Sequence, residues 1–290
     1  MNPYRPAAMP ARTGPRQGGQ SGTALAAALL ATLLAGCAQN PAPPTAAAAP
    51  APAPREARPA SDGGNPERRA QLRLELAAAY FSRGQSSTAL EEIQQAISAR
   101  PDFGPAFGLR GLILASLGDN ARADESFRRA LQLDPRDADT LHNYGWFQCQ
   151  LGRFAEAERN FEAALAQPQY IAAVRTWFAL GVCQARAGRL VDAERSLSRS
   201  YELDPASAVT AYNLADVLLR RGDASRARFY INRVNGNPEA SNAQSLWLAA
   251  RIEKRLGNDA AAQALGRQLR DRFPQSPETL QFERGRFDDV

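Results

Sequence analysis

The segment GPAFGLRGLILASLGDNARADESFRRALQLDPRD, residues 104–137, carries the pattern that decides the fold. Gly118 stands near its middle, and a second glycine, Gly111, precedes it by seven residues. Ala123 follows Gly118 by five residues, and Pro135 follows it by seventeen. Glycine adopts the left-handed conformation that ends a helix at little cost, and proline cannot continue a helix. The segment therefore predicts two helices joined by a tight turn, with small residues where they cross.

The same pattern recurs along the chain. Glycines follow one another at intervals of 34, 34, 36, 34 and 35 residues, at Gly84, Gly118, Gly152, Gly188, Gly222 and Gly257. Each has a small residue seven positions earlier, an alanine five positions later and a proline sixteen or seventeen positions later. Such a period is typical of repeats in which each helical pair packs on the next. The chain is thus predicted to be all-α, with six hairpins over residues 70–275, bounded as 70–103, 104–137, 138–173, 174–207, 208–242 and 243–275.

This pattern resembles the tetratricopeptide (TPR) family, in which helix-turn-helix repeats stack into a superhelix. The resemblance implies a TPR superhelix that binds another protein. Repeat six departs from the pattern, because Gly266 stands where the second helix usually has a large apolar residue. A divergent last repeat is typical of a cap. Residues 276–290 are expected to form a short capping helix and a tail.

Residues 1–36 are predicted to be a signal peptide. Three arginines and no acidic residue precede an apolar stretch at 24–35, and the start is either Met1 or Met9. The stretch is too short for a bilayer-spanning helix, which needs about 20 residues, and its flanks fit a secretory signal.

The residues Leu34-Ala35-Gly36-Cys37 resemble the bacterial lipobox. The resemblance implies that Cys37 is acylated and becomes the first residue of the mature protein. Apart from this covalent lipid, no cofactor is expected. The alternative is an ordinary cleaved signal with a chance cysteine. Ala38 stands where an aspartate commonly retains lipoproteins at the inner membrane, so we expect an anchor on the periplasmic face of the outer membrane.

Residues 37–69 are predicted to be a disordered tether behind the acylated cysteine. Twelve of the chain's 20 prolines lie before residue 67. The segment has too few apolar side chains to offset the entropy cost of ordering it.

Charge and motifs exclude several classes of function. Without residues 1–36 the chain carries 32 basic and 30 acidic residues, so it lacks the positive excess typical of nucleic-acid binding. His142 is the one histidine, and no metal-ligand spacing, glycine-rich phosphate loop or nucleophile motif is present. We therefore expect no catalytic residue, no metal, no small-molecule substrate and no enzyme activity.

A TPR stack binds partners with the face formed by the first helices. Carried over by repeat position, the resemblance implies a groove that is apolar and aromatic, with few charges. The lining positions are Leu74, Ala78, Phe81, Gly108, Leu112, Ala115, His142, Trp146, Cys149, Phe178, Val182, Tyr212, Asp216 and Leu219. Aromatic side chains in a groove suit an amphipathic partner segment. The alternative for each is packing against a neighbouring repeat.

Cys149 and Cys183 fall late in the first helices of repeats three and four. First helices of successive repeats lie side by side, and an oxidising periplasm permits a disulfide between them. We favour this pairing over the alternative of two small buried apolar residues.

The run His142-Asn143-Tyr144-Gly145-Trp146-Phe147-Gln148-Cys149, with Gly181-Val182-Cys183 after it, narrows the resemblance. With a lipobox ahead and a two-residue insertion between repeats three and four, the chain resembles the PilF/PilW lipoproteins of type IV pilus biogenesis. In that family N-N-Y-G-W-F-L-C is a frequent form, from which His142 and Gln148 depart. The resemblance implies an outer-membrane pilotin that binds the pilus secretin and promotes its localisation and multimerisation.

Two other classes stay open. One is another periplasmic TPR lipoprotein that serves as a scaffold for cell-envelope assembly. The other is an enzyme accessory or a sugar-binding TPR protein, for which a polar groove would be expected.

Overall fold

The computed structural model describes residues 65–287, and all of their regular elements are helices, thirteen in number. The first helices of the repeats are α1 (Pro66–Ser82), α3 (Gly104–Ser116), α5 (Ala138–Gln150), α7 (Ala173–Arg186), α9 (Ala208–Arg220) and α11 (Ala243–Arg255). The second helices are α2 (Ser86–Ala99), α4 (Asn120–Leu133), α6 (Phe154–Leu165), α8 (Leu190–Leu203), α10 (Ala224–Asn235) and α12 (Asp259–Arg272). The last helix is α13 (Pro277–Glu283).

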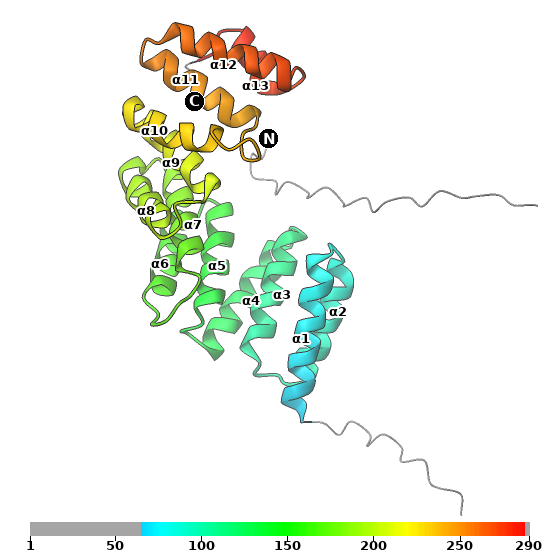
Figure 1. The fold of residues 1–290 in the computed structure, drawn as a ribbon. Coiled ribbons are helices and arrows are strands. Elements are labelled where there is room, and N and C mark those ends of the chain that lie inside the picture. Colours follow the sequence, from blue (N-terminus) through cyan, green and yellow to red (C-terminus); the bar gives the residue numbers. More distant parts are fainter. Residues whose placement is uncertain (1–64, 288–290) are drawn as a thin grey trace, which may run out of the picture. The chain divides into compact units, whose positions relative to one another are not determined.

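Each first helix pairs with the second helix that follows it, and the six hairpins stack in chain order (Figure 1). Each second helix also contacts the first helix of the next repeat. First helices contact one another as well, from α1 with α3 through to α9 with α11. The predicted all-α fold of TPR hairpins is confirmed. The predicted signal peptide, Cys37 and the tether up to residue 64 lie outside the described residues.

The turn inside each hairpin depends on its glycine. At the six turn glycines φ lies between 75° and 87°, in the left-handed region that other residues rarely adopt. In the first hairpin the amide of Gly84 donates to the carbonyl of Phe81, and the amide of Gln85 donates to that of Tyr80. These hydrogen bonds satisfy carbonyls that the end of a helix leaves without partners. The recurring glycine therefore sets where each first helix ends.

The small residue in each first helix allows the second helix to approach closely. A Cβ added to Gly111 would lie 2.9 Å from the ring of Phe127, and one added to Gly181 would lie 2.6 Å from Cγ of Leu197. Phe127 and Leu197 are fully buried. The second helix thus fills the space that the glycine leaves empty.

One predicted boundary is wrong. The tether was predicted to reach residue 69, but α1 begins at Pro66. The side chain of Asn65 accepts a hydrogen bond from the amide of Glu67, and proline suits the first helical position because it has no amide hydrogen to satisfy. Ala70 is already fully buried, so residues 66–69 belong to the first repeat.

Helix α13 packs against α11 and α12 and covers the end of the stack. Its Phe282 lies directly over Gly266, where an added Cβ would overlap the aromatic ring. The unusual glycine of repeat six therefore makes room for the capping helix. None of the described helices has both the length and the apolar character that a membrane span requires.

We predict that Gly266→Ala lowers the free energy of unfolding by about 1–3 kcal/mol, because the new methyl group overpacks against Phe282. In a Phe282→Ala background the same substitution should cost little, since the ring is gone and alanine favours a helix over glycine. Urea denaturation of the four proteins measures both effects. Equal losses in the two backgrounds would contradict the assignment.

Candidate partner-binding surface

The predicted groove residues lie on the first helices, on a surface that we call the inner face. Among the predicted positions Ala78 is exposed, and nine are half-buried: Leu74, Phe81, Leu112, Ala115, His142, Trp146, Phe178, Tyr212 and Asp216. Each has one side against the protein and another open to solvent. Four other predicted lining positions, Gly108, Cys149, Val182 and Leu219, are buried and form part of the packing between helices instead. The interior of a TPR stack needs these positions because consecutive first helices contact each other.

The aromatic residues of the inner face have fixed positions. Trp146 packs against two buried clusters, one in repeats three and four and one that extends from repeat four to repeat six, and Phe178 and Tyr212 pack against the second of these. Side chains that are held on one side and open on the other lose little conformational entropy when a partner covers them. Both alternatives for these residues therefore apply together: they pack against neighbouring repeats and still offer a surface.

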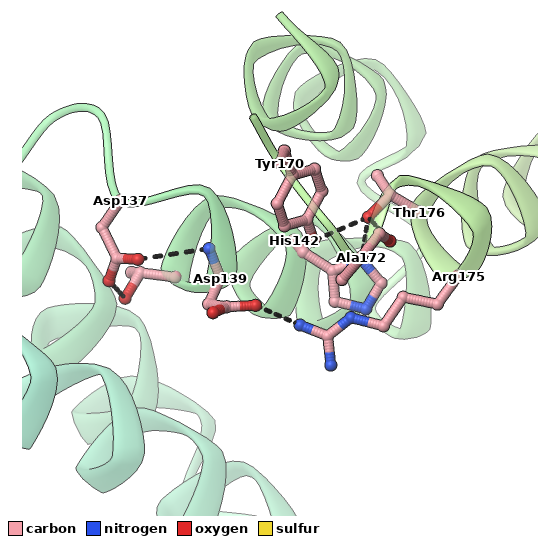
Figure 2. A network of polar contacts seen from close by, with 8 residues as sticks. Asp137, Asp139, His142, Tyr170, Ala172, Arg175 and Thr176 are labelled. Carbon is pink, nitrogen blue, oxygen red and sulfur yellow. Dashed lines mark hydrogen bonds and ion pairs between the residues drawn. The ribbon is translucent and has the colours of Figure 1, made fainter. Parts of the chain in front are cut away.

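Two contacts join repeat three to repeat four. One lies late in helices α5 and α7, and the other lies at their beginning. Late in these helices Cys149 and Cys183 form a disulfide, with their Cα atoms 5.8 Å apart. Both cysteines are buried. At the beginning of the same helices an ion pair joins Arg175 to Asp139 (Figure 2). The boundary between α5 and α7, which we call the seam, thus has a contact at each of its two ends.

His142 belongs to a polar network at that seam, which is centred on Oγ1 of Thr176 (Figure 2). Its Nδ1 lies 2.8 Å from Oγ1 of Thr176, and the hydroxyl of Tyr170 lies 2.9 Å from the same oxygen. Tyr170 belongs to the inserted loop between α6 and α7, where Gln169 has a φ of 64°. The network therefore connects α5, the insertion and α7.

Burial, and to a smaller extent the positive charge of Arg175, lowers the pKa of His142 from 6.5 to about 4. The imidazole is consequently neutral near pH 7, and one of its nitrogens can accept a hydrogen bond. The repeat pattern predicted that His142 belongs to the inner face. It did not predict a role for Thr176, because this residue stands outside the lining positions and belongs to no motif.

In repeats five and six the inner face carries several positively charged side chains. A hollow of about 580 Å³ is lined by Leu190, Leu219, Arg220, Gly222, Arg251, Lys254, Arg255 and Phe287. The expectation of few charges is therefore wrong at this end. The signal was present in the sequence: Arg251 and Lys254 follow Asp216 and Leu219 by one repeat of 35 residues.

Asp216 lies beside these cations. Burial raises the pKa of its carboxyl above the usual value, whereas the charges of Arg220 and Arg251 act to lower it. A carboxylate oxygen of Asp216 lies 3.6 Å from Nη1 of Arg220. Within residues 65–287 no group of three or more histidine, cysteine, aspartate or glutamate side chains is placed to hold a metal ion.

Comparison with known proteins agrees with this architecture. Tetratricopeptide-repeat models match residues 74–138, 149–208 and 126–159. The chain is 32% identical to PilW, described as a widely conserved type IV pilus biogenesis factor, whose crystal structure it matches with a TM-score of 0.69 over 73% of this chain and 97% of that one. The chain belongs to the PilF/PilW family.

Other members of the PilF/PilW family match over a similar length. The type IV pilus assembly protein PilF of Pseudomonas aeruginosa is 26% identical over 223 residues, which are 77% of this chain and 88% of that protein. The solved structure of P. aeruginosa PilF has a TM-score of 0.68 at 25% identity and covers 76% of this chain and 99% of that one. The family resemblance predicted from the run at 142–149 is thus confirmed.

We predict that falling pH destabilises the wild type more than a His142→Asn variant. The unfolded chain binds a proton at His142 below about 6.5, whereas the folded chain does so only below about 4, so acid favours unfolding between these values. From pH 7 to pH 4.5 the wild type should lose about 2 kcal/mol more than the variant. Urea denaturation at both pH values measures this difference. Parallel losses would show that His142 is not held neutral by burial.

Proposed function

We propose that this protein is an outer-membrane-anchored TPR adaptor, a pilotin, that binds the type IV pilus secretin and promotes its localisation and multimerisation. The observation that carries the proposal is the match to PilW over 97% of that chain. PilW and PilF are described as factors of type IV pilus biogenesis and assembly.

The inner face supports a binding role. It offers the half-buried rings of Trp146, Phe178 and Tyr212 at fixed positions. Large aromatic side chains dominate the affinity of many protein interfaces, and a surface organised before binding lowers the entropy cost of association. The seam between repeats three and four keeps Trp146 and Phe178, which come from different repeats, at one spacing.

Anchoring is the second part of the proposal. Acylation of Cys37 would hold the protein at the periplasmic face of the outer membrane, since more than one acyl chain gives stable binding whereas a single chain gives only marginal binding. The segment from Cys37 to Asn65 would then act as a tether; as a flexible coil of this length it spans roughly 30 Å. The protein acts by binding and carries out no reaction.

We predict that deleting the gene removes most heat-stable secretin multimers from the outer-membrane fraction and most surface pili. Complementation with the wild type should restore both, and labelled palmitate should enter it. A Cys37→Ser protein at the same level should take up no palmitate and should restore neither, because it leaves the membrane. Immunoblots of fractionated membranes, electron microscopy and autoradiography provide the measurements.

Normal secretin multimers and normal piliation in the deletion strain would overturn the pilotin assignment in favour of a scaffold for another envelope assembly. Failure of the wild type to incorporate palmitate would overturn the anchoring part alone.

A further inference from the structure

The lining positions of the inner face continue into repeat six. One repeat of 35 residues separates the last lining positions of repeat five from their equivalents in repeat six, which are Trp247, Arg251 and Lys254. All three belong to α11. Trp247 is only 7% exposed, whereas its equivalent in repeat five, Tyr212, is half-buried. The inner face of repeat six is therefore already covered.

Phe287 lies over these three positions. Its ring packs on that of Trp247, with 5.2 Å between centres, and the ammonium of Lys254 lies 6.0 Å from the centre of the same ring. Its carbonyl oxygen accepts a hydrogen bond of 3.2 Å from Nε of Arg251. One residue thus contacts all three lining positions, through an aromatic ring and a backbone carbonyl. Any extended peptide segment that carries an aromatic residue offers the same two groups.

Phe287 reaches this place because of the way in which α13 ends. Gly285 adopts a φ of 66°, and its amide donates to the carbonyl of Phe282. The amide of Arg286 donates to the carbonyl of Gln281. This is the turn that also ends the first helices of the repeats, where a second helix follows. After α13 the described chain instead continues onto the inner face.

Phe282 and Phe287 have different roles in this cap. Phe282 is 6% exposed and lies directly over Gly266, so it belongs to the core of repeat six. Phe287 is half-buried and forms part of the wall of the hollow of about 580 Å³, whose lining extends to Leu219 in repeat five. A ring that is held on one side and faces a hollow on the other is placed as a bound ligand is placed.

We propose that the inner face of repeat six is a binding site for an aromatic residue of an extended peptide segment, and that Phe287 occupies this site in the free protein. A partner segment that lies along the inner face displaces Phe287, places its own ring on Trp247 and presents a backbone carbonyl to Arg251. Phe287 thereby selects partners whose aromatic residue competes with it.

This inference rests on the binding role proposed above for the inner face. Its test uses purified protein and a small probe, so the inference can fail while the secretin phenotype stands, and the secretin phenotype can fail while the site stands.

The first measurement is fluorine NMR of the full mature chain labelled with 5-fluorotryptophan at positions 146, 177 and 247. In Phe287→Ala the resonance of Trp247 should move, because the ring 5.2 Å away is lost. The resonance of Trp177, in repeat four, should stay and so report an intact fold. The matched control Leu280→Ala removes an exposed apolar side chain from the same capping helix and should leave Trp247 unchanged.

Titration with N-acetyl-4-fluorophenylalaninamide measures the site itself, because the probe's own resonance reports its binding to unlabelled protein. Its dissociation constant for Phe287→Ala should be at least about five-fold lower than for the wild type. A tethered ring competes at an effective concentration on the order of millimolar, and an occupied site lowers apparent affinity. In Phe287→Ala/Arg251→Met the constant should rise again by about three-fold or more, since the hydrogen bond to a carbonyl is lost.

Three results would overturn the proposal. An unmoved Trp247 resonance in Phe287→Ala would show that Phe287 does not occupy the site. Equal affinity of the wild type and Phe287→Ala for the probe would make Phe287 an ordinary part of the cap. Equal displacement of the probe by N-acetylleucinamide and N-acetylphenylalaninamide would show that the site does not select an aromatic ring. If the Trp177 resonance also moved in Phe287→Ala, Phe287→Val would replace that variant under the same criteria.

Discussion

The close approach of the two helices in each hairpin is the constraint on which the rest of the structure depends. Gly111 and Gly181 leave space that Phe127 and Leu197 fill from the second helix. A side chain at either glycine would push the helices apart and change the angle at which the next repeat docks. Because the two helices of each hairpin pack closely, the first helices come into contact with one another and form one continuous inner face.

The seam between repeats three and four shows how the stack accommodates an irregularity. The extra residues of the loop between α6 and α7 would leave a less constrained joint, but Tyr170 in that loop shares Thr176 with His142. A disulfide closes the other end of the same pair of helices. Closing a loop of about 35 residues removes conformational freedom from the unfolded chain, an effect on the order of 3–4 kcal/mol in the loop-entropy model. The joint between repeats three and four is therefore closed by a covalent bond at one end and by hydrogen bonds at the other.

Much of this could be predicted from the sequence, because turn glycines and crossing residues act locally and recur. The period located each hairpin, and repeat position located Trp146, His142 and Asp216 on the inner face. Contacts between residues distant in sequence were not predictable in this way. Nothing near Gly266 indicates that Phe282 will lie over it, and nothing near His142 indicates Thr176. The basic hollow was not predicted for a different reason: three of its four cations, Arg251, Lys254 and Arg255, belong to repeat six, whereas the lining positions implied by the resemblance end in repeat five.

The central claim is that the inner face binds the secretin, and site-specific photo-cross-linking in living cells tests it most directly. A benzoylphenylalanine placed at Phe178 or Tyr212 replaces one aromatic ring with another on the inner face. Phe229, an exposed aromatic residue on second helix α10, provides the matched control. The account predicts secretin adducts from positions 178 and 212 and none from 229. Adducts from 229 alone, in cells that still assemble pili, would contradict it.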